Sequence, residues 1–384
     1  MSGFNLSISS TERKTELLFD QVDIGSLKLK NRAVLAPMTR ISADADGCVN
    51  EQMLTYYSRF AAGGFGLIIT EGSYIDTAES QTYLHQPGMA TPKHVEAWRA
   101  LVSALHTEGA AVVAQLQHSG PQSQGNPHSQ RLFAPSNIPA RGEQLSMYRG
   151  EGPYVVPQEM TQEDIDNVQQ AFVDSALRAR DAGFDGVELH GANGYLIDAF
   201  LTDYLNQRTD HYGGNPSNRV RFAVETAQRV RAAVGEDFLV GIRISQGKVS
   251  DAHHRWAGGV DEALTIFGSL AQSGVDYIHT TEWKAEAPAF PDEDERSLAA
   301  LAKQAAPNLT VIANGHIDTG ESATSLLRRG DADLVAIGKA ALANPDWPIR
   351  VHDGIEVDAP FAPAATGGLA TIKEAELLQP LHTS

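Results

Sequence analysis

Three polar side chains follow one another closely in residues 187–196, whose sequence is Val-Glu-Leu-His-Gly-Ala-Asn-Gly-Tyr-Leu. His190, Asn193 and Tyr195 stand directly after a short apolar run, with glycines between them. All three can form the hydrogen bonds by which an enzyme binds and activates a substrate, although they could also bond only to nearby backbone. Loops held at strand ends carry most catalytic groups, so the spacing His-x-x-Asn-x-Tyr predicts a catalytic loop.

The elements that must position this loop alternate regularly along the chain. We expect eight strands, at residues 33–37, 66–70, 111–116, 186–190, 239–244, 277–280, 310–313 and 334–337. A helix is expected after each strand, at residues 52–62, 92–107, 163–181, 218–234, 260–273, 297–304, 322–328 and 340–351. This alternation indicates a parallel sheet of the α/β class, and eight repeats indicate a closed (β/α)8 TIM barrel. A doubly wound sheet is the alternative, which the number of repeats disfavours.

Residues 19–29 precede the first barrel strand and are typical of a β-hairpin that closes the barrel bottom. No linker interrupts the series, so we expect residues 1–384 to form a single barrel domain, with peripheral tails at 1–17 and about 361–384. Long connections after the third and sixth strands lie on the face where such barrels place their active sites, the carboxyl ends of the strands.

Two of these strand ends favour an anion. Residues 314–315 (Asn-Gly) and 338–339 (Gly-Lys) stand where barrels often bind phosphate, because glycine exposes backbone N–H groups and lysine adds positive charge. Arg243 lies within a strand, where a guanidinium needs an anionic partner. It either faces an electron-rich cofactor or forms a structural ion pair with a carboxylate such as Glu188.

Composition limits the range of partners. The chain has 384 residues, 42% of them hydrophobic, and a net charge of -18, which disfavours nucleic acid and anionic membrane surfaces. Its one cysteine, Cys48, excludes an intramolecular disulfide and a cysteine-ligated iron–sulfur cluster. The sequence contains neither a membrane-spanning apolar segment nor the apolar core of a signal peptide. We therefore expect a cytoplasmic protein, a monomer or homo-oligomer, that acts on a small molecule.

The strand-end residues resemble a known family. The motifs are Ala-Pro-Met-Thr-Arg at 36–40, Gln-Leu-Gln-His at 115–118, His-Gly-Ala-Asn-Gly-Tyr-Leu at 190–196 and Asn-Gln-Arg-Thr-Asp-His-Tyr-Gly-Gly at 206–214. On these motifs the chain, from about residue 18 to about residue 350, resembles the old yellow enzyme family of FMN-dependent ene-reductases.

The resemblance implies that FMN lies across the barrel mouth. Contacts with the flavin ring and the phosphate are implied for Pro37, Met38, Thr39, Gly72, Gln115, Arg243, Asn314, Gly315, Gly338 and Lys339. Among them Arg243 would stabilise the negative charge of the reduced flavin. Lys339 and Pro121 stand where many relatives have arginine, so the phosphate contact and one charged contact of the loop differ from the family pattern.

The resemblance also implies the reaction. NADPH or NADH reduces FMN, and hydride then passes from flavin N5 to the β-carbon of an activated alkene, either an α,β-unsaturated carbonyl compound or a nitroalkene. His190 and Asn193 would bind the substrate's oxygen, and Tyr195 would protonate the α-carbon.

Two other enzyme classes use barrels of this kind. A metallohydrolase needs a His-x-His pair at the end of the first strand, where this chain has Met-Thr-Arg, so we expect no metal. A cofactor-free phosphate-binding aldolase or isomerase needs a lysine or carboxylate base at the barrel centre. Lys248 and Lys284 are expected in loops, which disfavours this alternative.

Overall fold

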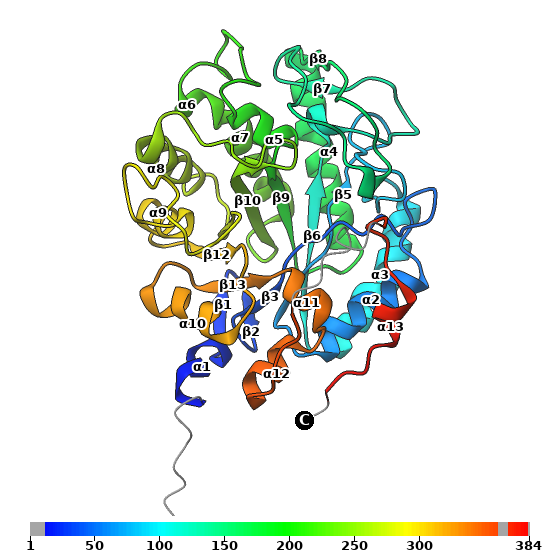
Figure 1. Ribbon diagram of the computed structural model, residues 1–384. Coiled ribbons are helices and arrows are strands. Elements are labelled where there is room, and N and C mark those ends of the chain that lie inside the picture. Colours follow the sequence, from blue (N-terminus) through cyan, green and yellow to red (C-terminus); the bar gives the residue numbers. More distant parts are fainter. Residues whose placement is uncertain (1–11, 360–367, 383–384) are drawn as a thin grey trace, which may run out of the picture.

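The structure is a computed structural model that describes residues 12–359 and 368–382. Eight parallel strands form a closed barrel (Figure 1): β3 (Ala33–Leu35), β4 (Leu67–Ile69), β6 (Ala111–Gln117), β9 (Gly186–Asn193), β10 (Leu239–Lys248), β11 (Tyr277–Thr281), β12 (Thr310–Asn314) and β13 (Leu334–Ile337). The barrel closes because β13 pairs with β3 and β4 pairs with β6. The short β5 (Ser73–Tyr74) also pairs with β6, beyond the end of β4. The predicted (β/α)8 barrel is confirmed.

Helices surround the barrel, namely α2 (Glu51–Ala62), α3 (Pro92–Thr107), α4 (Gln162–Asp181), α7 (Arg221–Val234), α8 (Gly259–Leu270), α9 (Leu298–Ala305) and α10 (Gly320–Arg329). The single helix expected at 340–351 is wrong, since two helices, α11 (Lys339–Ala343) and α12 (Trp347–Asp353), occupy the region. Asn344 precedes Pro345, and a residue before proline is driven out of the helical conformation; its φ of -135° and ψ of 82° agree. The expected helix 218–234 is likewise divided into α6 (Pro216–Arg219) and α7.

A β-hairpin closes the bottom of the barrel, as predicted. Strands β1 (Val22–Ile24) and β2 (Leu27–Leu29) pair in antiparallel fashion. Ile24 and Leu29 pack in one cluster with the first residues of three barrel strands, Leu67, Leu239 and Leu334. The apolar plug leaves the opposite end of the barrel for the polar residues.

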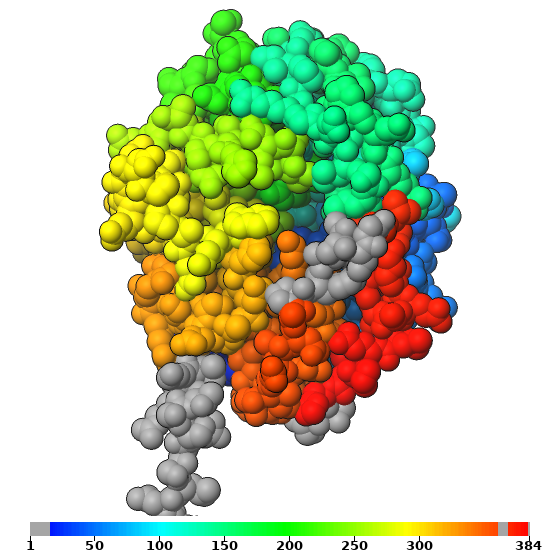
Figure 2. Space-filling model, viewed as in Figure 1, coloured from blue at the N-terminus to red at the C-terminus, as the bar shows by residue number. Residues whose placement is uncertain are grey.

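Both ends of the described chain pack against the barrel. Helix α1 (Glu12–Phe19) contacts α10 and α12. Residues 368–382 include α13 (Glu374–Leu378), which lies beside α2, and Arg59 of α2 donates a 2.8 Å hydrogen bond to the Leu377 carbonyl oxygen. Figure 2 shows this red segment on the surface next to the blue residues of the first helices. Of the expected tails, residues 1–11, 360–367 and 383–384 lie outside the described residues.

Two strands run three or four residues further than expected at the carboxyl end of the barrel. β9 continues to Asn193 and β10 to Lys248, and these two residues pair across the strands after an irregularity. The connection after β6 contributes a second small sheet, in which β7 (Phe133–Ala134) pairs with β8 (Gln158–Glu159). Among the described residues, no helix combines the length and apolarity needed to cross a lipid bilayer.

Candidate active site

The predicted catalytic segment forms a tight turn at the end of β9. The turn runs from Ala192 to Tyr195 and is closed by a 3.3 Å hydrogen bond from the Tyr195 N–H to the Ala192 oxygen. Its central residues, Asn193 and Gly194, have φ angles of +64° and +90°. Type I′ turns require positive φ at both central positions, and Asn-Gly is the pair that adopts it most easily. The motif therefore has a local structural cause, although His190 lies inside the strand and not after it.

The Tyr195 side chain is buried among other rings. Its hydroxyl lies 2.7 Å from the Tyr83 hydroxyl, and its ring meets the His190 ring edge-on with centroids 4.8 Å apart. Tyr83 in turn packs on Tyr148, with centroids 4.4 Å apart. Burial raises the pKa of Tyr195 well above its ordinary value, so the phenol keeps its proton at neutral pH. Sequence reasoning missed Tyr83, which lies in the connection after β5 without any local pattern to mark it.

His190 and Asn193 have hydrogen-bonding groups that residues 12–359 and 368–382 leave unpartnered. Within the described chain, His190 Nδ1 is buried and has no partner. Burial, aided by the nearby charge of Arg243, lowers the pKa of His190 well below its ordinary value, so the imidazole is neutral. Asn193 bonds to the described residues through its backbone, with its N–H on Ser245 and its carbonyl oxygen on Gln122. Its side-chain amide has no hydrogen-bond partner among the described residues.

A cavity of about 210 Å³ opens at the carboxyl ends of β3, β11, β12 and β13, and Arg243 reaches it from within β10. Seven of the ten predicted cofactor contacts line it, namely Pro37, Met38, Arg243, Asn314, Gly315, Gly338 and Lys339. Thr39, Gly72 and Gln115 complete the predicted set and lie outside this lining, at the ends of β3, β4 and β6. Trp283 also lines the cavity, and sequence reasoning did not predict it. This residue is 71% exposed, and the centroid of its ring lies 5.5 Å from Lys339 Nζ.

Arg243 is held by neutral partners. Its Nη2 donates to Asn314 Oδ1 at 2.8 Å and to Thr281 Oγ1 at 3.1 Å. Its Nε is buried and, in the described part of the chain, has no partner. The ion pair with Glu188 that we considered as an alternative is not formed by these described residues. The guanidinium thus retains a buried N–H for an acceptor that enters the cavity.

Glu188 instead forms the centre of a buried network beneath the strand ends. It accepts hydrogen bonds from Gln115 Nε2 at 2.8 Å, His279 Nδ1 at 2.8 Å and the Tyr277 hydroxyl at 3.1 Å. Burial alone raises the pKa of Glu188, but His279, Arg243 and the Gln115 amide outweigh that effect and lower it. A carboxylate only accepts hydrogen bonds, so the Gln115 amide turns its NH2 toward Glu188 and presents its oxygen on the other side.

Two predicted glycines lie in close contacts. A Cβ atom on Gly315 would lie 2.1 Å from the Glu282 carbonyl oxygen, and this glycine has a φ of +141°. A Cβ atom on Gly72 would lie 2.0 Å from Gln117 Oε1. At Gly315 the clash would be with backbone at a positive φ, so only glycine fits there, whereas at Gly72 a Cβ atom would require the Gln117 amide to move.

The C-terminal segment reaches the end of β3. Arg40 follows Thr39, is 1% exposed and pairs with Glu376 of α13 at 2.7 Å.

The backbone N–H of Arg40 donates to Glu71 Oε2 at 2.8 Å, and the Tyr57 hydroxyl lies 3.3 Å from Glu71 Oε1. Burial raises the pKa of Glu71 to about 7, against the opposing effect of the Arg40 N–H. Sequence reasoning missed these contacts, of which the Arg40–Glu376 pair joins residues 336 positions apart.

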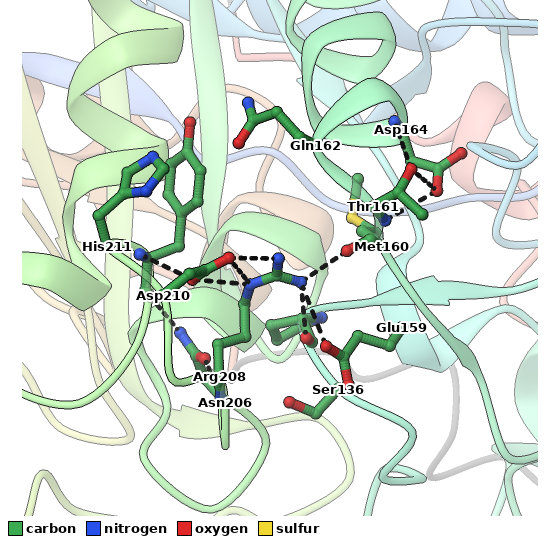
Figure 3. Close-up of polar contacts among 12 residues, drawn as sticks. Ser136, Glu159, Met160, Thr161, Gln162, Asp164, Asn206, Arg208, Asp210 and His211 are labelled. Carbon is green, nitrogen blue, oxygen red and sulfur yellow. Dashed lines mark hydrogen bonds and ion pairs between the residues drawn. The ribbon is translucent and has the colours of Figure 1, made fainter.

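The motif at 206–214 is structural in its contacts (Figure 3). Arg208 donates to the carbonyl oxygens of Pro135 at 3.1 Å and Met160 at 2.6 Å, and pairs with Asp210. Asn206 donates to the carbonyl oxygen of Tyr212 at 2.8 Å. The Arg208 bonds fasten the long connection after β6 to the segment that follows the turn at residues 192–195.

The expectation that Lys248 lies in a loop is wrong, because it is the last residue of β10. Its Nζ lies 2.6 Å from Asp198 Oδ1, and both side chains are 0% exposed. A lysine so enclosed cannot meet a substrate. Glu188 is equally buried and fully hydrogen-bonded, so neither residue supplies the base that a cofactor-free aldolase or isomerase needs.

Comparison with known proteins gives a consistent result. The sequence model of the NADH:flavin oxidoreductase / NADH oxidase family matches residues 17–358. An NADH oxidase of Thermoanaerobacter brockii is 33% identical over 88% of this chain and 51% of its own length, so the chain spans about half of that relative. The flavin oxidoreductase hxnT of Emericella nidulans is 33% identical, over 89% of this chain and 92% of its own length. A 12-oxophytodienoate reductase of Arabidopsis thaliana is also 33% identical, over 92% of both chains.

Solved structures agree with the sequence relatives. The old yellow enzyme homologue of Zymomonas mobilis superposes with a TM-score of 0.84 at 29% identity, covering 95% of this chain and 99% of that one. Morphinone reductase in complex with tetrahydroNAD gives a TM-score of 0.82 at 30% identity, covering 95% and 98%. The predicted enzyme class, NAD(P)H-dependent flavin oxidoreductase, is confirmed at the level of the family. The chain belongs to the NADH:flavin oxidoreductase / NADH oxidase family, that is, to the old yellow enzymes.

Proposed function

We propose that the protein is an FMN-dependent ene-reductase, which uses NADPH or NADH to reduce an α,β-unsaturated carbonyl compound or a nitroalkene. The observation that carries the proposal is the Tyr195 hydroxyl, a buried proton donor beside a neutral His190 at the barrel mouth. Passing electrons from a nicotinamide to a flavin requires no such donor, whereas reduction of a C=C bond requires one proton for each hydride. The names of the 12-oxophytodienoate reductase and morphinone reductase relatives support the same class of reaction.

The residues around the cavity fit FMN. Arg243 offers a buried N–H that has no partner in the described chain, and Gln115 presents an amide oxygen near Gly72. In this proposal the flavin ring is held by Pro37, Met38, Thr39, Gly72, Gln115 and Arg243, and the phosphate by Gly315, Gly338, Lys339 and the backbone of Asn314. The Asn314 side chain is already bonded to Arg243 and to the Ala336 oxygen. Bound FMN supplies hydride transfer, from NAD(P)H and then to the β-carbon of the alkene.

The residues of the turn complete the reaction. His190 and Asn193 bind the oxygen of the substrate, and their hydrogen bonds strengthen as that oxygen gains negative charge. Tyr195 gives its hydroxyl proton to the α-carbon, so the product carries one added hydride and one added proton. The tyrosinate oxygen then accepts a hydrogen bond from Tyr83, 2.7 Å away, until a proton from solvent replaces the one transferred.

Separate measurement of the two half-reactions tests the proposal. Protein loaded with FMN should be reduced anaerobically by NADPH or NADH, and the comparison of the two rates gives the preferred nicotinamide. The reduced protein should be reoxidised by an enone, a nitroalkene or a maleimide. Tyr195→Phe should slow reoxidation by the enone about 10²–10⁴-fold, the usual contribution of a general acid, and leave reduction nearly unchanged.

The matched control is Tyr212→Phe, since the Tyr212 hydroxyl bonds to Glu225 and not to the turn. This variant should leave both half-reactions nearly unchanged. Equal losses in both half-reactions of Tyr195→Phe would show that Tyr195 is not the proton donor. A wild-type protein that cannot be loaded with FMN would refute the proposed function as a whole.

A further inference from the structure

A fully buried ion pair between a lysine and an aspartate lies next to the turn at residues 192–195. Asp198 is in α5 (Leu196–Leu201), directly after the turn, and Lys248 ends β10. Both are 0% exposed, and the two charged atoms are 2.6 Å apart. Removing two charges from water costs about as much as their attraction returns, so such a pair is weak evidence of a gain in stability. Its position suggests a different role.

The two carboxylate oxygens of Asp198 accept hydrogen bonds from different parts of the chain. Oδ1 accepts from Lys248 Nζ, and Oδ2 accepts from the backbone N–H of Gly194 at 2.5 Å. Lys248 also lies opposite Asn193 in the register of β9 and β10. The ion pair therefore joins the end of β10 to the centre of the turn through a single carboxylate.

The side-chain bond from Asp198 matters more for the position of the turn than for that of His190. His190 lies in the parallel ladder opposite Arg243, where ordinary strand pairing fixes its backbone. Asn193 is the last residue of the ladder, where Ser245 and Gln122 also bond its backbone, and Tyr195 lies beyond the ladder. Gly194, which Asp198 holds, stands between the two. Loss of the anchor would displace these two side chains and leave His190 in place.

We propose that Asp198 and Lys248 are positioning residues, whose ion pair fixes the turn so that Asn193 and Tyr195 face the substrate together. What the two positioned side chains do there rests on the function proposed above. The fixing of the turn itself does not, because it concerns the backbone N–H of Gly194.

The test uses the FMN-loaded protein and the double variant Asp198→Asn/Lys248→Met, which removes both buried charges and so avoids leaving one unpaired. Hydrogen exchange of the peptide covering residues 191–198 should become about tenfold faster, as expected when one hydrogen bond to a charged acceptor is weakened. Affinity for a phenol such as 4-hydroxybenzaldehyde, read from the flavin spectrum, should fall about tenfold, while FMN affinity should stay unchanged.

The control is Arg219→Met/Glu262→Gln, which removes another buried ion pair, between α6 and α8. It should change the melting temperature without altering exchange in 191–198 or phenol affinity. Wild-type exchange rates and phenol affinity in the Asp198/Lys248 variant would overturn the proposal, and so would equal losses in the control. If wild-type protein binds no phenol, the proposed function fails, and the exchange rates alone still decide whether the ion pair fixes the turn.

Discussion

Replacing Glu71 by glutamine should change how the stability of the protein depends on pH. Burial raises the pKa of Glu71 to about 7 from an ordinary value of 4.5. A carboxyl group whose pKa rises on folding stabilises the folded state only in its protonated form. Its contribution is therefore complete below pH 4.5 and is lost as the pH rises through 7.

The size of the effect follows from the gap between these two pKa values. At about 1.4 kcal/mol for each pH unit, the total is about 3 kcal/mol, of which about 2–3 kcal/mol is lost between about pH 5 and pH 8. The Glu71→Gln variant keeps an acceptor for the Arg40 N–H but cannot ionise. Its free energy of unfolding should therefore decline less than that of the wild-type protein over this range, by the same 2–3 kcal/mol.

Urea denaturation at fixed FMN concentration, followed by tryptophan fluorescence at about pH 5 and pH 8, measures this difference. Glu321→Gln, on the exposed surface of α10, removes the same charge elsewhere and should behave as the wild-type protein does. Parallel decline of the unfolding free energy in wild-type protein and Glu71→Gln would mean that Glu71 is ionised in the fold, and the reasoning from burial would be refuted.

Two further predictions concern the site itself. Arg243→Met should weaken FMN binding about ten- to a hundredfold in a fluorescence titration, because a charged hydrogen-bond donor is lost. The control Arg221→Met, on the outside of the barrel, should leave FMN affinity unchanged. Equal FMN affinities in the two variants would contradict the role of Arg243. His190→Ala should weaken the binding of phenols, which resemble the enolate, about tenfold or more without changing FMN affinity, and unchanged phenol binding would remove His190 from the oxygen site.

The fold could be predicted because its signals are local. Eight alternations of strand and helix, and polar residues at the strand ends, follow from the order of residues within short windows. The signal for the turn at residues 192–195 is likewise local, since two positive φ angles in succession favour an Asn-Gly pair. Element boundaries were less accurate, because pairing between neighbours decides where β9 and β10 end.

The missed residues have their partners far away in the sequence. Tyr83 meets Tyr195 across 112 positions, and His279 meets Glu188 across 91. Neither Tyr83 nor His279 stands in a sequence pattern that indicates a functional residue, because their partners become neighbours only in the folded barrel. The prediction that Lys248 lies in a loop failed for a related reason. A lysine after a glycine is typical of a loop, and the partner that allows this lysine to be buried at the end of β10 is Asp198, 50 positions earlier.

The contact between Arg40 and the C-terminal segment has a consequence for genetic variation. A premature stop codon near position 360 would spare all eight barrel strands, and the truncated product could still be expected to form the barrel. It would nevertheless lack Glu376, the carboxylate that neutralises the buried Arg40 next to Thr39. Loss-of-function alleles should therefore extend to the codon for residue 376, well beyond β13, the last strand of the barrel.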